Sequence, residues 1–124
     1  MGYHLLDPEA LASTPDFPCD RRSLTEASDL STLAAAVYTV DPGERLARTY
    51  HSHDQREELF YVISGTLHVR TPERTFEVES GRVFVVEPGN PILPHVPETA
   101  TQPARVLGVG APMYDPGRQY DPDD

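Results

Sequence analysis

Turn-forming residues constrain the fold of this chain more than any other feature. Thirteen prolines and eight glycines are spread along its 124 residues and divide it into short segments. Proline lacks the backbone N–H that helices and strands use, and glycine adopts backbone angles that other residues avoid, so both residue types end regular elements. A long helix has little room between them, whereas short strands joined by tight turns fit well. The spacing therefore predicts an all-β fold.

The segments between the turns have the composition of strands. Their starts fall about every 8–12 residues, which is the spacing of a β-sandwich or barrel. Residues 75–79 alternate, with Phe76 and Val78 on one face, whereas the segments LFYVI and VFVV are apolar throughout. Continuous apolar strands need cover on both faces. We expect strands at residues 32–40, 45–53, 58–64, 66–71, 75–79, 82–87 and 104–110.

The two ends of the chain differ in composition from its middle. Residues 1–24 are rich in proline, aspartate and serine, which predicts an extended arm with a short helical turn at residues 8–12. The tail after Pro112 is polar, so it is expected to extend along the surface with Tyr114 or Tyr120 as an anchor. We therefore divide the chain into an N-terminal arm (1–30), one β-barrel (31–112) and a polar C-terminal tail (113–124), a size typical of a single domain.

The charge balance argues against two classes of partner. The chain has 20 acidic and ten basic residues, a formal net charge of −10, and every basic residue is arginine. Sequence-independent binding to nucleic acid and adsorption to anionic membranes both need an excess of Lys and Arg, so neither is expected. An acidic surface without lysine fits a halophilic source, in which high salt screens the self-repulsion. A GC-rich genome that encodes Arg in place of Lys explains it equally well, and melting curves in low and molar KCl distinguish the two.

The remaining composition indicates a cytoplasmic protein. No apolar run reaches the roughly 18 residues of a membrane span, and the first residues lack the basic start and apolar core of a signal peptide. Cys19 is the only cysteine, so it cannot form an internal disulfide. No histidine or aspartate at a suitable spacing marks Cys19 as a nucleophile, and we expect a buried, inert thiol.

A pair of histidines carries the strongest chemical signal. In His51-Ser52-His53, strand alternation directs both imidazoles to one face, about 7 Å apart along the strand. Glu58 opens the next expected strand. Two imidazoles and a carboxylate suit a divalent transition metal, because imidazole matches Zn, Ni, Fe and Cu and the carboxylate neutralises charge. The alternative is a surface histidine pair next to a solvated acidic segment.

Two stretches of the sequence resemble the motifs of the cupin superfamily. The first, His51-x-His53-x4-Glu58-x6-Gly65, resembles the pattern G(x)5HxH(x)3–4E(x)6G, except that seven residues instead of five separate the leading glycine, Gly43, from the first histidine. The second, GRVFVVEPG at residues 81–89, resembles the opening of the second cupin motif, with arginine at the usual aspartate and glutamate at the usual first proline. The resemblance covers residues 37–109 and is to small single-domain cupins of haloarchaeal type.

The resemblance implies a double-stranded β-helix, the jelly-roll barrel of cupins, with His51, His53 and Glu58 pointing into the barrel. Cupins usually add a third histidine three residues after the glycine of the second motif. Here Ile92 stands at that position, and His95 follows three residues later. Strand alternation directs positions 92 and 95 to opposite faces, although a bulge at the flanking prolines would turn His95 inward.

Three hypotheses for the site follow. His51, His53 and Glu58 bind a divalent transition metal (Zn, Ni, Fe or Mn) with His95 as a fourth ligand; they bind it alone, with open coordination positions; or the metal has been lost and the pocket holds a small molecule. The first two predict a metal-dependent enzyme of the isomerase or dioxygenase type acting on a small molecule. The third predicts a non-catalytic ligand-binding cupin. No general base is assigned, and Tyr50 and His95 are weak candidates.

Further expectations concern the surroundings of the site and the assembly. The apolar outer faces of LFYVI and VFVV need cover, so we expect a homodimer. Three side chains flank the candidate ligands and are the first candidates for lining the pocket: Tyr50, Phe60 and Val62. For Phe60 and Val62, packing in the core is the stronger expectation. Three arginines near the barrel mouth either face an acidic substrate or pair with surface carboxylates, and we favour the pairing: Arg45, Arg48 and Arg70.

Overall fold

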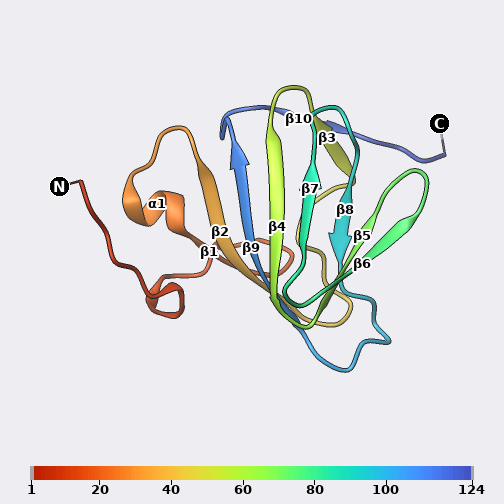
Figure 1. Ribbon diagram of the computed structural model, residues 1–124, viewed down its shortest axis with the longest axis horizontal. Helices are drawn as coiled ribbons and strands as arrows, with labels where there is room; N and C mark the ends of the chain where they lie inside the picture. Colours follow the sequence, from red (N-terminus) through yellow and green to blue (C-terminus); the bar gives the residue numbers. More distant parts are fainter. Residues whose placement is uncertain (1, 124) are drawn as a thin grey trace.

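The computed structural model describes residues 2–123, and its regular elements are almost all strands (Figure 1). The all-β prediction is confirmed. Within the described residues the longest helix has five residues, and none is long and apolar enough to cross a membrane. The elements are η1 (Pro8–Ala10), β1 (Asp20–Ser23), α1 (Leu24–Ser28), β2 (Ala34–Val40), β3 (His51–His53), β4 (Glu57–Ser64), β5 (Thr66–Arg70), β6 (Thr75–Glu79), β7 (Val83–Val86), β8 (Leu93–His95), β9 (Ala104–Ala111) and β10 (Gly117–Gln119).

Two layers of antiparallel strands enclose the core. The larger sheet has the order β1-β2-β9-β4-β7. The second layer contains the sheet β6-β5-β8 and the pair β10-β3. A single bridge between His51 of β3 and Ile92, the residue before β8, connects the two. Successive side chains of a strand point to opposite faces, so every second side chain points into the space between the layers. In β9 every second residue is buried. The side chains with almost no exposed surface include Val40, Val62, Leu67, Val69, Pro94, Val96, Ala104 and Val106.

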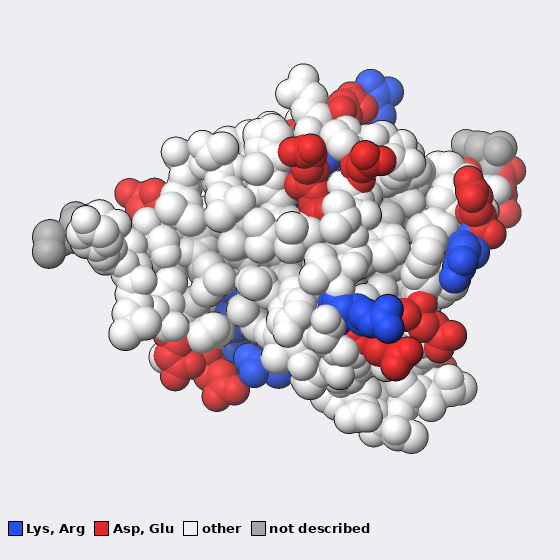
Figure 2. All heavy atoms as spheres, viewed as in Figure 1, with Lys and Arg blue, Asp and Glu red and all other residues white. Residues whose placement is uncertain are grey.

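The acidic excess lies on the outside of this barrel. Figure 2 shows acidic side chains in groups around the margin of the molecule, interrupted by a few arginines. In the middle of the same face, the central parts of β4 and β7 carry no charged atoms, whereas charged groups lie over the ends of these strands. Charge is therefore distributed unevenly over the surface that this view presents.

One predicted strand is mostly absent, while the other six agree with observed strands to within two residues. Of residues 45–53 only β3 is a strand, because the segment before it is held by isolated contacts instead of a ladder. Arg45 forms a single bridge with His95, and the Leu46 N–H donates to the Pro94 carbonyl at 2.9 Å. Leu46 is 4% exposed and packs in the core, so this segment closes the barrel end without joining a sheet.

Sequence reasoning missed four short elements, α1, β1, β8 and β10. β1 and β10 are polar, and pairing with β2 and β3 holds them in place. α1 had a readable signal, because Ser23 caps it by accepting a hydrogen bond from the Glu26 N–H at 3.1 Å, three residues on. The division into arm, barrel and tail stays a prediction, with β1 and β10 supplied by the predicted arm and tail.

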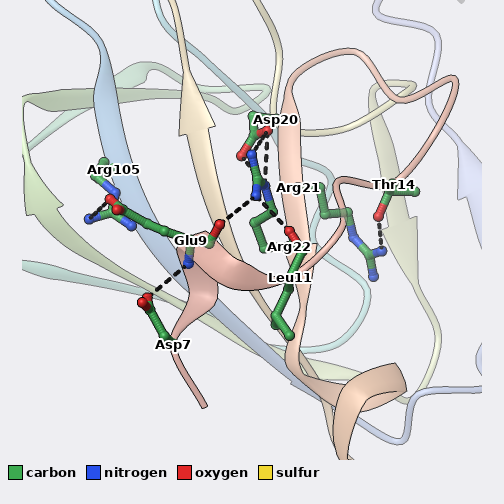
Figure 3. Close-up of polar contacts among 8 residues, drawn as sticks. All are labelled: Asp7, Glu9, Leu11, Thr14, Asp20, Arg21, Arg22 and Arg105. Carbon is green, nitrogen blue, oxygen red and sulfur yellow. Dashed lines mark hydrogen bonds and ion pairs between the residues drawn. The ribbon is translucent and has the colours of Figure 1, made fainter.

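Arginine side chains fasten the N-terminal arm to β1 (Figure 3). Arg22 binds the Asp20 carboxylate at 3.0 Å, and its Nη1 donates to the carbonyls of Leu11 at 2.6 Å and Glu9 at 3.2 Å. The neighbouring Arg21 reaches away from this cluster toward Thr14. Successive residues of a strand point to opposite faces, so Arg22 binds the arm on the outer face of β1 and Arg21 binds Thr14 of the arm on the other face.

The buried thiol of Cys19 gives a direct test of this packing. Cys19 is 6% exposed, and burial, followed by the nearby Glu44 and Asp20 carboxylates, raises the pKa of its thiol to about 12. Because the thiolate is the reactive form, we expect no reaction of the native protein with a disulfide reagent at pH 8. The same reagent should label one thiol per chain in concentrated guanidinium, which is the control. Stoichiometric labelling of the native protein would contradict this burial.

Candidate functional site

A cavity of about 640 Å³ opens at one end of the barrel, between the arm, β3, β4 and β10. Its wall is assembled from segments that are distant in the sequence. It is lined by Thr14, Phe17, Arg21, Tyr38, Leu46, Ala47, Arg48, Thr49, His51, His53, Arg56, Glu58, Phe60, Ile92, Pro94, Gly117 and Gln119. The cavity therefore contains three of the four candidate ligands predicted from the sequence, His51, His53 and Glu58.

The two histidines meet in this cavity. β3 alternates, so His51 and His53 face the same side, as expected. Their Nε2 atoms are 3.1 Å apart, and the ring planes are nearly perpendicular, at 86°. Two nitrogen ligands that each lie about 2.1 Å from one ion, at an angle of about 90–110°, are about 3.0–3.4 Å apart. The separation of the histidine nitrogens matches that of two ligands to one metal ion.

The other ring nitrogens define the protonation of the pair. His51 Nδ1 lies 2.8 Å from the Thr49 carbonyl oxygen, and His53 Nδ1 lies 2.8 Å from the Asp115 carbonyl oxygen. A carbonyl only accepts hydrogen bonds, so each Nδ1 must carry the proton and donate. In a neutral imidazole the Nε2 atom is then a bare acceptor. Two Nε2 atoms 3.1 Å apart need a proton or a metal ion between them, because two bare lone pairs at that distance repel each other, and the donor set fits a metal ion.

The C-terminal strand covers the histidine pair. β10 pairs with β3 in register, placing Gly117 opposite His53. A Cβ atom added at Gly117 would lie 3.1 Å from Cδ2 of His51 and 3.6 Å from Cε1 of His53. The backbone at Gly117 therefore lies close against both rings, and a side chain there would require the His51 ring to shift by a few tenths of an ångström. Sequence reasoning missed this contact because the tail has no apolar pattern.

Glu58 lies on the same wall but does not complete a ligand cluster. Its side chain is 16% exposed, and its Oε2 lies 3.9 Å from Nη1 of Arg56. Arg56 is itself held by the tail, since it donates to the carbonyls of Pro112 at 3.2 Å and Met113 at 2.9 Å. Across residues 2–123, no group of three or more His, Cys, Asp or Glu side chains is close enough to hold a metal ion. The histidine pair is therefore preformed and a third ligand is not.

His95 lies on the other face of β8, away from the pair. Ile92 and Pro94 line the cavity, and alternation turns His95 outward. Its ring stacks at a tilt against His68, with centroids 5.8 Å apart. Burial lowers the pKa of His95, and the neighbouring His68, Arg70 and Arg45 lower it further. No bulge re-aims it, so the structure brings Ile92, and not His95, beside His51.

Of the three expected pocket liners, Phe60 lines the cavity, whereas Val62 is a core residue with no exposed surface. Tyr50 is buried elsewhere, with its ring 4.8 Å from that of Tyr120 and 5.2 Å from the guanidinium of Arg70. Burial raises the pKa of Tyr50, and its hydroxyl has no hydrogen-bond partner among the described residues. Tyr120 thus anchors the tail, as expected, and Tyr50 does not face the histidine pair.

The arginines differ most from the expectation. Within residues 2–123 none of the three expected surface arginines, Arg45, Arg48 and Arg70, forms an ion pair with a carboxylate. Arg48 lines the cavity instead, together with Arg21 and Arg56, which sequence reasoning did not select. Arg21 lies in the predicted arm, and no local pattern connects it with the histidines 30 residues later. Only the pairing of β1 with β2 brings it there.

Comparison with known proteins agrees with this architecture. The family description "Cupin domain" matches residues 36–110. A sugar phosphate isomerase from a cupin superfamily, from Silicibacter pomeroyi, is 18% identical with a TM-score of 0.81, over 95% of this chain and 82% of that one. The polyketide cyclase RemF from Streptomyces resistomycificus is 20% identical with a TM-score of 0.77, over 96% and 86%.

A third similar structure is described by its fold. It is a conserved protein with a double-stranded β-helix domain from Klebsiella pneumoniae, 16% identical with a TM-score of 0.74, over 96% of this chain and 98% of that one. No curated protein matches this chain in sequence. At these identities the likeness concerns the fold, and the predicted double-stranded β-helix is confirmed.

Proposed function

Because this chain belongs to the cupin family, we propose that it is a small cupin whose barrel pocket binds one divalent transition metal ion and a small-molecule ligand. The observation that carries the proposal is the pair of Nε2 atoms, 3.1 Å apart, of His51 and His53. Both histidines donate Nδ1–H to a backbone carbonyl, the arrangement that orients metal-binding imidazoles. Glu58, on the same wall, is the proposed carboxylate ligand. His95 is left out of the set because it packs against His68.

The residues of the pocket would have different roles in such a site. When bound, the ion supplies Lewis-acid polarisation of a ligand oxygen. The carbonyls of Thr49 and Asp115 fix the tautomers of the two histidines, and Glu58 neutralises part of the added charge. Phe60 and Ile92, 4% and 3% exposed, keep water from one side of the site. An isomerase-type reaction on a small molecule is the proposed activity, supported by the likeness to a protein named a sugar phosphate isomerase.

A non-catalytic ligand-binding cupin is the second candidate. It is favoured by Ile92, which lines the pocket at the position where the cupin resemblance implies a third histidine. The two candidates differ in their response to His53→Ala. An enzyme should lose both metal and activity with its fold intact, whereas a binding protein should keep its ligand.

Metal content tests the proposal directly. Untagged protein, purified without chelator and then soaked separately in Zn(II), Ni(II), Fe(II) and Mn(II), is analysed by mass spectrometry. We expect close to one ion per chain for at least one of the four metals. A pocket that takes up none of them would remove the metal from the proposal and leave the ligand-binding alternative.

A homodimer through the outer face of β4 and β7 is the proposed assembly. β7 is an edge strand, and Figure 2 shows an uncharged middle over these strands. An apolar face next to an open sheet edge is a surface that a second copy can cover by two-fold pairing. The apolar side chains of this face, 37–66% exposed, are Leu59, Tyr61, Ile63, Val83 and Val85.

One matched pair of leucine variants tests this dimer. Leu59, 37% exposed, lies opposite Val85 in the β4–β7 register, and Leu33, 40% exposed, lies outside the face. We expect Leu59→Asp to be a monomer by light scattering at micromolar concentration, because a dimer would bury the new charge. Leu33→Asp should remain a dimer like the wild type. A monomeric wild type, or two variants that behave alike, would rule out this interface.

A further inference from the structure

The charge of the pocket is opposite to that of the chain. Its wall contains three arginines and two histidines against one carboxylate, Glu58. The whole chain has 20 acidic and ten basic residues, and acidic groups surround the face in Figure 2. An arginine-rich concave wall in an acidic protein concentrates anions at that wall and directs them there from solution.

Two of these arginines keep hydrogen-bond donors for a ligand. Arg21 donates to Thr14 Oγ1 at 2.9 Å, and Arg48 donates to the carbonyl of Asp16. Neither forms an ion pair with a carboxylate in the described part of the chain. A guanidinium carries five N–H donors. Each of these arginines uses a hydrogen bond to the protein and keeps enough N–H groups to bind an oxyanion through two of them.

A single aromatic ring holds both guanidinium groups in place. The Cζ atom of Arg48 lies 5.0 Å from the centre of the Phe17 ring, and that of Arg21 lies 5.6 Å from it. Stacking on an aromatic face limits the conformations of a planar guanidinium. The two positive groups therefore lie at one part of the wall and are ordered before a ligand arrives, which lowers the entropy lost on binding.

The wall also contains apolar side chains, among them Tyr38, Phe60 and Ile92. The volume of about 640 Å³ is in the range of small-molecule sites. We infer that the pocket takes a small organic oxyanion, a carboxylate or a phosphate on an apolar body, with the oxyanion bound by Arg21 and Arg48. The inference rests on one part of the proposed function, that this pocket binds a small-molecule ligand. It does not depend on the metal ion.

Calorimetric titration of the full-length chain with three probes, benzoate, phenyl phosphate and neutral benzamide, tests the inference. We expect one of the two anions to bind with and without metal, and benzamide to bind at least about 10-fold more weakly, because it cannot form charge-assisted hydrogen bonds. Arg48→Gln and Arg21→Gln should each weaken the preferred anion about 10- to 100-fold without changing metal content. The tighter of the two anions distinguishes a carboxylate from a phosphate site.

Arg74→Gln is the matched control. Arg74 also lies over an aromatic ring, with Cζ 4.3 Å from the centre of the Phe76 ring, but neither residue lines this pocket. Arg74→Gln should bind the preferred anion with the affinity of the wild type. Arg48→Lys keeps the charge and loses the forked donor, so its affinity for the anion should lie between those of the wild type and Arg48→Gln.

Three outcomes overturn the inference. In the first, no probe binds at millimolar concentration. In the second, benzamide binds as tightly as both anions. In the third, the Arg21 and Arg48 variants bind like the wild type. Anion binding that is lost with the metal in His53→Ala and is unaffected in the arginine variants would support the metal site and overturn the arginine site.

Discussion

Replacing Gly65 by alanine is expected to destabilise this protein by more than about 3 kcal/mol, a large part of the stability of a typical domain. Gly65 joins β4 to β5 with φ +75, a conformation that costs a residue with a Cβ atom about 1–2 kcal/mol. The added Cβ would also overlap the carbonyl oxygen of Pro103 and lie 2.9 Å from Cα of Ala104. Both are backbone atoms where the chain enters β9. The overlap can therefore be relieved only if part of the larger sheet shifts.

Gly81→Ala is the control for this prediction. Gly81 has a similar φ of +84, but a Cβ there would meet nothing within 4 Å. Gly81→Ala should lower the free energy of unfolding by about 1–2 kcal/mol, which is the cost of the left-handed conformation alone. Urea unfolding followed by circular dichroism measures both variants against the wild type. Equal losses in the two would mean that the contact with Pro103 does not matter, and that the turn conformation alone selects glycine.

His53→Ala is expected to lower metal affinity by at least about 100-fold, since loss of an outer partner alone costs about 10–100-fold. It removes one of the two converging Nε2 atoms and leaves His51 as a single preformed ligand. Competition with a chelating dye, for whichever metal the wild type takes up, measures the change. Unchanged thermal unfolding of the metal-free variant separates a lost ligand from a lost fold.

Ile92→His supplies the converse experiment. Ile92 lines the cavity next to His51 and exchanges two backbone hydrogen bonds with it, at 3.0 and 3.3 Å. A histidine there would add a third imidazole and is expected to raise metal affinity at least about tenfold, by analogy with the cost of losing a partner. Leu93→His places the same residue on the opposite face of the chain and should have no effect. A gain in Leu93→His, or none in Ile92→His, would mean that the ion does not sit between His51 and His53.

The barrel could be predicted from the sequence because its strands carry the information locally. Phe76 and Val78 alternate, and the turn glycines 65 and 81 stand where strands must end. The positions of His51 and His53 followed from the same alternation. The convergence of these rings could not be predicted, because it depends on carbonyls from Thr49 and from the distant Asp115.

The arginines of the pocket could not be predicted for a different physical reason. Arg21 stands in a polar stretch, DRRS, in which no apolar pattern distinguishes one arginine from the other. Its orientation comes from the register of β1 on β2, in which it lies opposite Tyr38. Arg22, one residue on, points outward to Asp20. A shift of one residue in that register would exchange the roles of the two arginines.

The composition of the cavity wall bears on how such proteins diversify. The segment common to the family spans residues 36–110, yet Phe17, Arg21, Gly117 and Gln119 of the wall lie outside it, on either side. Mutation of these flanking segments can change part of the pocket wall while the residues common to the family stay the same. The common segment contains Arg48, His51 and His53, so two members with nearly identical barrels can diverge in one part of their pocket and keep the other.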